Sequence, residues 1–178
     1  MKSALLVIDV QHALFHTNHA PADADGVIER INALSRRARA LNVPVIFIQH
    51  ERAGSPLEFG SAGWQLDSRL DVHDADARLR KTTPDSFLGT ELQRILSDAG
   101  VTHVAVCGYA SEFCVDTTVR RAAGLGFDVT LARDAHTTHD KPHLSGAMIS
   151  AHHNETLSSI TSFAAKIRAL PAESIWPN

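Results

Sequence analysis

The sequence has few cysteines and no marked excess of charge. Its 178 residues include 2 cysteines, too few for the disulfide framework that stabilises many small secreted proteins. The 17 basic and 20 acidic residues leave a net charge of −3, and no basic block stands out, so the electrostatic signature of a nucleic-acid-binding protein is missing. No apolar run is long enough for a membrane span. We therefore expect no nucleic-acid partner and no membrane partner.

The N-terminal residues also lack a secretion signal. The stretch MKSALLVIDVQ runs directly into a short apolar segment that ends in an acid, without a long apolar core or a small-residue cleavage site. We therefore expect a cytoplasmic protein. Hydrophobic residues make up 44%, and the length fits one sizeable core, so we expect a single domain over residues 1–178.

Short β-rich runs alternate with helical periodicity along the chain. Residues 4–10 form a continuous apolar run, which is typical of a strand buried on both faces. The patterns predict further strands at 43–49, 102–107 and 127–132, helices at 27–41, 92–99 and 111–123, and a tail with a helix from Lys141, a weak strand at 157–161 and a last helix to about residue 170. Repeated β-α-β units predict an α/β protein with three layers, α-β-α, around a mostly parallel, Rossmann-like sheet of five to six strands.

One long segment, residues 51–83, does not follow this alternation. It is rich in glycine and contains Pro56 and Trp64, and we interpret it as a long loop. Such a loop in a compact domain is usually functional or disordered. Trp64 either borders a pocket or pins the loop to the body of the protein.

The expected ligand-binding edge follows from the sheet. Ligands of open parallel sheets bind beyond the carboxyl ends of the strands. This rule points to Asp9, the His50 region, the loop after Cys107 and residues 134–139.

The two cysteines have different surroundings in the sequence. Cys107 lies inside an apolar strand, where a free cysteine behaves as a small hydrophobic residue. Cys114 follows a short loop and precedes helical spacing, so Ser111 is a candidate N-cap and Cys114 falls in the first turn. The positive end of a helix and its free N–H groups favour a thiolate, which is the nucleophilic form. The alternative is a packing cysteine on the buried face of this helix.

Asp9 and Lys81, taken alone, each have a structural interpretation that needs no catalytic role. Asp9 closes an apolar strand, and a partly desolvated carboxylate suits a general base, although it could equally tie the following loop. Lys81 ends the long loop region, where a lysine is usually a solvated surface charge.

Four motifs together resemble the isochorismatase-like cysteine hydrolases, the superfamily of nicotinamidase and N-carbamoylsarcosine amidase. They are LLVIDVQ, KTTPDSF, VCGYASEFCVDTTVRRAAGLGF and LARDAHTT, in the family order and at family-like separations. The resemblance covers most of the chain and is looser over residues 51–78 and the last 25 or so. It implies an isochorismatase-type fold and a homodimer or larger homo-oligomer.

The resemblance also implies a catalytic triad of Cys114, Asp9 and Lys81. Cys114 would attack an amide-like carbonyl and form a thioester, Asp9 would move the proton and then activate water, and Lys81 would support the anion. A cis peptide between Tyr109 and Ala110 would direct the Ala110 N–H, together with that of Cys114, into an oxyanion hole.

The histidines and the second strand bear on metal binding. Nicotinamidases carry an Asp-x-His metal motif after this strand, whereas the chain has Gln49, His50 and Glu51 there. We therefore predict no bound zinc or iron and no cofactor. The 11 histidines include His136 and His139, which we interpret as surface or pocket-edge residues.

The predicted substrate is a small amide, carbamoyl or related C–N compound. Candidate contacts are Phe15, Trp64, Phe87, Tyr109 and His136, although each aromatic residue could instead belong to the core. Alternative functions are an isochorismatase-type ether hydrolase, a non-catalytic α/β small-molecule-binding module and a metal hydrolase. A nucleotide-binding Rossmann protein is disfavoured because no Gly-x-Gly-x-x-Gly motif or P-loop is present.

Overall fold

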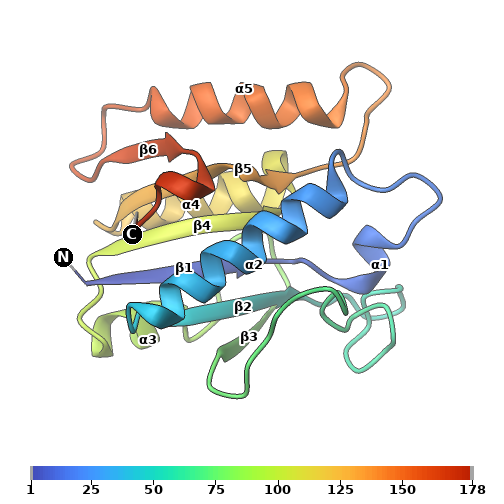
Figure 1. The fold of residues 1–178 in the computed structure, drawn as a ribbon, viewed down its shortest axis with the longest axis horizontal. Coiled ribbons are helices and arrows are strands. Elements are labelled where there is room, and N and C mark those ends of the chain that lie inside the picture. The colour runs from blue at the N-terminus through green and yellow to red at the C-terminus, as the bar shows by residue number, and fades with distance from the viewer. Residues whose placement is uncertain (1, 177–178) are drawn as a thin grey trace.

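The computed structural model describes residues 2–176 and contains one six-stranded parallel sheet with helices on both faces (Figure 1). The sheet order is β3-β2-β1-β4-β5-β6. The strands are β1 (Ser3–Ile8), β2 (Val45–His50), β3 (Ala77–Lys81), β4 (His103–Tyr109), β5 (Asp128–Thr137) and β6 (Ile167–Leu170). The predicted three-layer α/β fold is confirmed.

Helix α2 covers one face of the sheet, and α3, α4 and part of α5 cover the other (Figure 1). The helical elements are α1 (His12–Phe15), α2 (Ala24–Ala40), α3 (Leu92–Asp98), a π-helical turn (Ser111–Val115), α4 (Asp116–Gly124), α5 (Gly146–Ser158) and a 3-10 turn (Ala172–Ser174). None of the helices in residues 2–176 is long and apolar enough to cross a lipid bilayer.

Strand β1 has the two buried faces that its continuous apolar run predicts. Leu5 and Val7 pack with α2, while Leu6 and Ile8 pack with the helices of the opposite face. β1 lies between β2 and β4 and is fully buried from Ala4 onward. The carboxyl end of this strand is therefore held rigidly by its neighbours.

Two edge strands correct the sequence analysis. The segment 51–83 is not a loop throughout, because its last residues form β3. Residues 157–161 form no strand, and the predicted last helix to residue 170 is instead β6. Both edge strands alternate buried and exposed residues, as in ARLRK of β3, so they lack the apolar run that marks the central strands.

We expect Gly108→Ala to lower the free energy of unfolding by about 3 kcal/mol or more. Gly108 has a φ of 116°, and an added Cβ would lie 2.1 Å from the carbonyl oxygen of Ile8 on the neighbouring strand. Gly124→Ala is the matched control, because the nearest atom to its Cβ is 3.7 Å away in Phe163. Urea unfolding of both variants measures the difference, and equal stability would contradict the expectation.

Candidate active site

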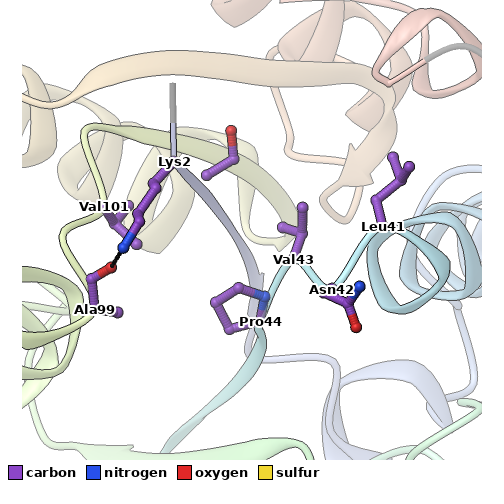
Figure 2. Close-up of a pocket in the computed structure, with 8 residues that line it drawn as sticks. Lys2, Leu41, Asn42, Val43, Pro44, Ala99 and Val101 are labelled. Atoms are coloured by element: carbon purple, nitrogen blue, oxygen red, sulfur yellow. Dashed lines mark hydrogen bonds between the residues drawn. The ribbon is translucent and has the colours of Figure 1, made fainter.

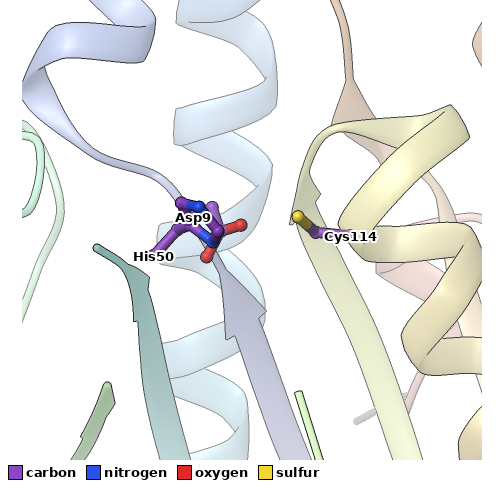
Figure 3. Close-up of side chains that lie close together, drawn as sticks. All are labelled: Asp9, His50 and Cys114. Atoms are coloured by element: carbon purple, nitrogen blue, oxygen red, sulfur yellow. The ribbon is translucent and has the colours of Figure 1, made fainter. Parts of the chain in front are cut away.

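Three side chains meet at the carboxyl edge of the sheet. Asp9 directly follows β1, Lys81 is the last residue of β3, and Cys114 lies in the π-helical turn that follows β4. Lys81 Nζ donates to Asp9 Oδ2 over 2.7 Å, and the two residues are 2% and 1% exposed. Figure 3 shows the sulfur of Cys114 on the side that faces Asp9. The chain thus places a thiol beside a buried ion pair.

The ammonium group of Lys81 is fully engaged. It also donates to the carbonyl oxygen of Thr83 over 3.1 Å, and it lies 3.4 Å from Nδ1 of His50. The interpretation of Lys81 as a solvated surface charge is therefore wrong. The carboxylate of Asp9 and the carbonyl oxygen of Thr83 replace the water that this buried group loses.

The backbone of Asp9 is unusual for a residue other than glycine. Its φ is 51°, in the left-handed region that aspartate and asparagine tolerate better than most residues. Its N–H donates to the carbonyl oxygen of Ile48 over 2.8 Å, and its own carbonyl accepts from Gln11 N–H over 2.9 Å. The chain turns sharply here, which ties Asp9 to the end of β2.

Cys114 lies in a widened helical turn. The carbonyl oxygen of Ala110 accepts the N–H of Val115 over 3.1 Å, five residues on, and also that of Phe113 over 3.0 Å. The Tyr109–Ala110 peptide bond before this turn is cis. Among the described residues, the Ala110 carbonyl receives no hydrogen bond from the Cys114 N–H that lies between these two donors.

The predicted N-cap at Ser111 is wrong. Ala110 occupies the cap position, and the Ser111 hydroxyl is buried 2.8 Å from both His136 Nδ1 and Ser150 Oγ. The hydroxyl therefore ties the turn to β5 and α5 and caps no backbone N–H. The spacing of Ser111 and Cys114 resembles an α-helical first turn, which a π-helical turn replaces here.

The electrostatics of Cys114 also differ from the expectation. Burial, followed by the charge of Asp9, raises the pKa of Cys114 to about 12, and Lys81 offsets only part of this. The thiol is thus protonated near neutral pH, and the expected resting thiolate is wrong. Burial likewise raises the pKa of Cys107, whose Sγ lies 3.5 Å from the carbonyl oxygen of Leu6. Cys114 needs a base before it can act as a nucleophile.

We expect iodoacetamide to alkylate Cys114 on the order of 10²–10³-fold more slowly than free cysteine at pH 7.5. The rate should rise with pH through pH 10, because the pKa of Cys114 is raised to about 12. Asp9→Asn should speed alkylation, since it removes a charge that raises this pKa. Peptide mass spectrometry measures the rate at each cysteine, and a wild-type rate that levels off below pH 8 would contradict the expectation.

His50 belongs to the same cluster, and sequence reasoning missed its contacts. One ligand atom from each of Asp9, His50 and Cys114 lies within 4.8 Å of the others (Figure 3). Burial, followed by the charge of Lys81, lowers the pKa of His50, which favours a neutral imidazole. The rule that ligands bind at strand carboxyl ends pointed to the His50 region, but the contact itself depends on the pairing of His50 with Lys81 across β2 and β3.

The residues that flank His50 do not complete a nicotinamidase-type metal site. The side-chain amide of Gln49 donates to the carbonyl oxygen of Trp64 over 3.0 Å. Glu51 pairs with Arg80, with Nε and Oε2 2.7 Å apart. Both flanking side chains are committed elsewhere, so this arrangement does not fit the metal site that the resemblance raised.

Three of the proposed substrate contacts are structural. Phe87 is 6% exposed and stacks on Phe127 in the core at 6.0 Å between ring centroids. Phe15 is 3% exposed and packs edge-on against Tyr109. His136 is buried between Ser111 and Asn154, whose Oδ1 lies 2.9 Å from its Nε2. Phe15 and Phe87 were predicted as apolar pocket walls and His136 as a surface or pocket-edge residue, and all three are instead covered by neighbouring side chains.

Tyr109 and Trp64 stay candidates for substrate contact because both are only partly buried. The Tyr109 hydroxyl lies 2.8 Å from Nδ1 of His139, at the carboxyl edge of the sheet. The Trp64 ring packs edge-on against Phe59, 4.9 Å away, and its carbonyl accepts the side-chain amide of Gln11 over 2.8 Å. The loop of Trp64 is thus pinned to the strand ends.

A separate pocket of about 370 Å³ opens at the amino edge of the sheet, opposite the cluster of Asp9, Lys81 and Cys114 (Figure 2). Its lining includes Leu41, Pro44 and Val101, and Lys2 is its one titratable side chain. Lys2 Nζ donates to the carbonyl oxygen of Ala99 over 3.3 Å. This pocket has no acid–base pair or nucleophile, so the chemistry of the chain concentrates at the carboxyl edge.

Comparison with known proteins identifies the family of this chain. The family model described as the isochorismatase domain matches residues 3–162. The chain belongs to the isochorismatase family. The resemblance of its four motifs to that family is therefore confirmed.

Individual known proteins are similar over most of this chain. A streptothricin hydrolase of Streptomyces noursei is 40% identical over 144 residues, which are 80% of this chain and 57% of that protein. The match to a second protein of that name covers 51% of that protein, so the chain spans about half the length of these relatives. A crystal structure of an isochorismatase family protein superposes with a TM-score of 0.87 at 33% identity, covering 94% of this chain and 97% of that one.

Proposed function

We propose that this chain is a cysteine hydrolase that cleaves the C–N bond of a small amide or carbamoyl compound through a thioester. The observation that carries the proposal is the buried Asp9–Lys81 pair beside the thiol of Cys114. Burying an ion pair has a large desolvation cost, so its position beside a thiol supports a catalytic role. A thiol, a base and a fixed cation are the parts that covalent acyl transfer needs.

In the first step Asp9 acts as the general base. The thiol of Cys114 is protonated at neutral pH because its pKa is raised to about 12, so its proton must leave as the sulfur attacks. Asp9 accepts this proton, and the sulfur bonds to the carbonyl carbon. Lys81, 2.7 Å from Asp9, holds the carboxylate in place and compensates the charge that develops at sulfur.

The carbonyl oxygen becomes an oxyanion in this step. In residues 2–176, the N–H groups of Phe113 and Val115 donate to the Ala110 carbonyl, whereas the N–H of Cys114 does not. This supports the use of the Cys114 N–H as an oxyanion donor. The Ala110 N–H, on the cis peptide just before the turn, is the proposed second donor. Both groups come from the backbone, so substitution of side chains would leave them in place.

The leaving amine takes the proton from Asp9 as the C–N bond breaks. A thioester to Cys114 remains, and Asp9 is again a carboxylate. Asp9 then removes a proton from water, the hydroxide adds to the thioester carbonyl, and the carboxylic acid leaves as Cys114 regains a proton. The balanced reaction is amide plus water to acid plus amine.

A pocket beside the π-helical turn, not lined by Asp9, Lys81 or Cys114 themselves, is a candidate for binding an apolar part of the substrate. It has a volume of about 420 Å³ and its lining includes Phe113, Leu144 and Ile149, with Glu112 and Lys141 at its polar side. Phe113 and Glu112 directly precede Cys114 in the turn. A small molecule with an apolar part fits this lining, and the sequence also predicts a small substrate.

The test is a panel of primary amides, carbamoyl compounds and vinyl ethers incubated with the wild-type protein. Ammonia or amine release from the amides, with an acyl adduct on the Cys114 peptide in a rapid acid quench, is the expected result. Cleavage of a vinyl ether without an adduct would support the ether-hydrolase alternative. Binding of panel members without any turnover would support the binding-module alternative, and both outcomes would overturn the proposal.

A further inference from the structure

We propose that Asp9, His50 and Cys114 form a binding site for a thiophilic divalent cation such as Zn²⁺, and that metal binding there blocks the nucleophile. The three ligand atoms lie within 4.8 Å of one another at the carboxyl edge (Figure 3). A carboxylate, an imidazole and a thiolate are the ligand types that zinc prefers. The blocking effect rests on the proposed function, whereas the binding itself does not.

The carboxylate of Asp9 has a free oxygen for this purpose. Lys81 occupies Oδ2, while Oδ1 is buried and has no hydrogen-bond partner among the described residues. A buried carboxylate oxygen without a partner is costly and uncommon, so it is suited to a ligand. Because Lys81 neutralises the carboxylate from its other side, a metal ion at Oδ1 and the ammonium group at Oδ2 can share Asp9.

His50 is oriented for the same role. Its Nδ1 lies 3.4 Å from Lys81 Nζ. Nε2 can bind a metal in the tautomer that carries the ring proton on Nδ1, in which Nδ1 accepts no hydrogen bond from Lys81. A neutral imidazole is the form that binds a metal, and burial together with Lys81 favours that form. Three protein ligands and one open position for water make the coordination of a tetrahedral zinc site. Ligand atoms up to 4.8 Å apart must draw together, because Zn–N and Zn–S bonds are about 2.0–2.3 Å.

Metal binding and catalysis exclude each other at the sulfur. Cys114–SH and Zn²⁺ give Cys114–S–Zn and a proton, which passes to solvent or buffer. The metal ion withdraws electron density from the bound sulfur and occupies the side that faces Asp9, so the sulfur is a much weaker nucleophile toward a carbonyl. Since a proton is released, the metal affinity should fall as the pH falls. This set of ligands differs from the Asp-x-His motif, which the chain lacks, and it predicts an inhibitory ion and no metal cofactor.

The experiment titrates the purified protein with Co²⁺, which reports a thiolate ligand through an ultraviolet charge-transfer band. We expect a band that saturates at one Co²⁺ per chain and that Zn²⁺ removes by competition. Cys114→Ser should abolish the band, and His50→Gln should weaken Co²⁺ affinity at least tenfold. His152→Gln is the matched control, because His152 is exposed and lies outside the cluster of Asp9, His50 and Cys114, with its Nε2 3.1 Å from Thr156 Oγ1 and its ring against that of His153. Circular dichroism checks that each variant is folded.

Two outcomes would overturn the inference. One is the absence of the band in folded wild-type protein, and the other is unchanged Co²⁺ affinity in folded His50→Gln. Alkylation at pH 9 provides a second measure, because Zn²⁺ should protect Cys114 and leave Cys107 unaffected. These measurements need no substrate. If the amide panel shows no hydrolysis but the band appears, the metal site stands and the proposed function fails. If hydrolysis occurs but the band is absent, the proposed function stands and the metal site fails.

Discussion

Replacing Cys114 with alanine will lower kcat/KM for an amide substrate on the order of 10⁴-fold or more, because the thioester can no longer form. The base Asp9 and the cation Lys81 stay in place in this variant, but no other thiol lies in their cluster among the described residues. The rate of amine release and the mass of the Cys114 peptide after an acid quench measure the effect. Loss of rate and loss of the acyl adduct should occur together.

Cys107→Ala is the matched control for this result. Cys107 is fully buried in β4, where it packs in the hydrophobic core and its Sγ lies 3.5 Å from the carbonyl oxygen of Leu6 in β1. Its loss removes packing in the core, so we expect a modest loss of stability and an unchanged rate of amine release. If Cys114→Ala keeps more than about a hundredth of the wild-type rate, covalent catalysis at this residue is contradicted.

Replacing Lys81 with methionine will remove activity and lower the free energy of unfolding by about 3–5 kcal/mol, because it leaves the carboxylate of Asp9 buried without a cation. Both side chains are almost completely covered, and their ion pair is 2.7 Å long. Solvent therefore screens the lost interaction little. Urea unfolding measures the stability, and the amide assay measures the activity.

The double variant Asp9→Asn/Lys81→Met separates the two effects. It removes both charges from the buried site, so the unfolding free energy should recover most of the loss of Lys81→Met. Activity should stay absent, because neither the base nor the cation remains. A double variant that is as unstable as Lys81→Met would show that packing around the lysine stem, and not the unpaired carboxylate, determines stability here.

The central part of the fold could be predicted from the sequence because its strands are apolar on both faces. The predicted strands at 4–10, 43–49 and 102–107 contain the continuous apolar runs 4–8, 45–48 and 104–107, and each run forms most of a central strand. The edge strands could not be found in this way. In β3, Leu79 and Lys81 face inward while Arg78 and Arg80 face solvent, so the pattern looks like that of a charged loop.

The site could be predicted only in part. The motif resemblance named Asp9, Lys81 and Cys114, but each residue alone had a structural alternative. The burial of Lys81 depends on β3 being a strand, and the contact of His50 depends on the register that pairs it with Lys81. The raised pKa of Cys114 depends on how deeply the turn is covered. These are properties of packing between segments far apart in the sequence, which periodicity does not reveal.

The order of strands in the sheet also affects how the chain is synthesised. β1 is made first, yet it lies inside the sheet, where residues 3–8 pair with residues 103–108 of β4. Until β4 leaves the ribosome, an apolar strand has one edge without a hydrogen-bonding partner, and such edges promote aggregation. Parallel pairing over this sequence separation is also slow. The yield of folded protein should therefore depend on chaperones that shield β1 while residues 51–109 are translated.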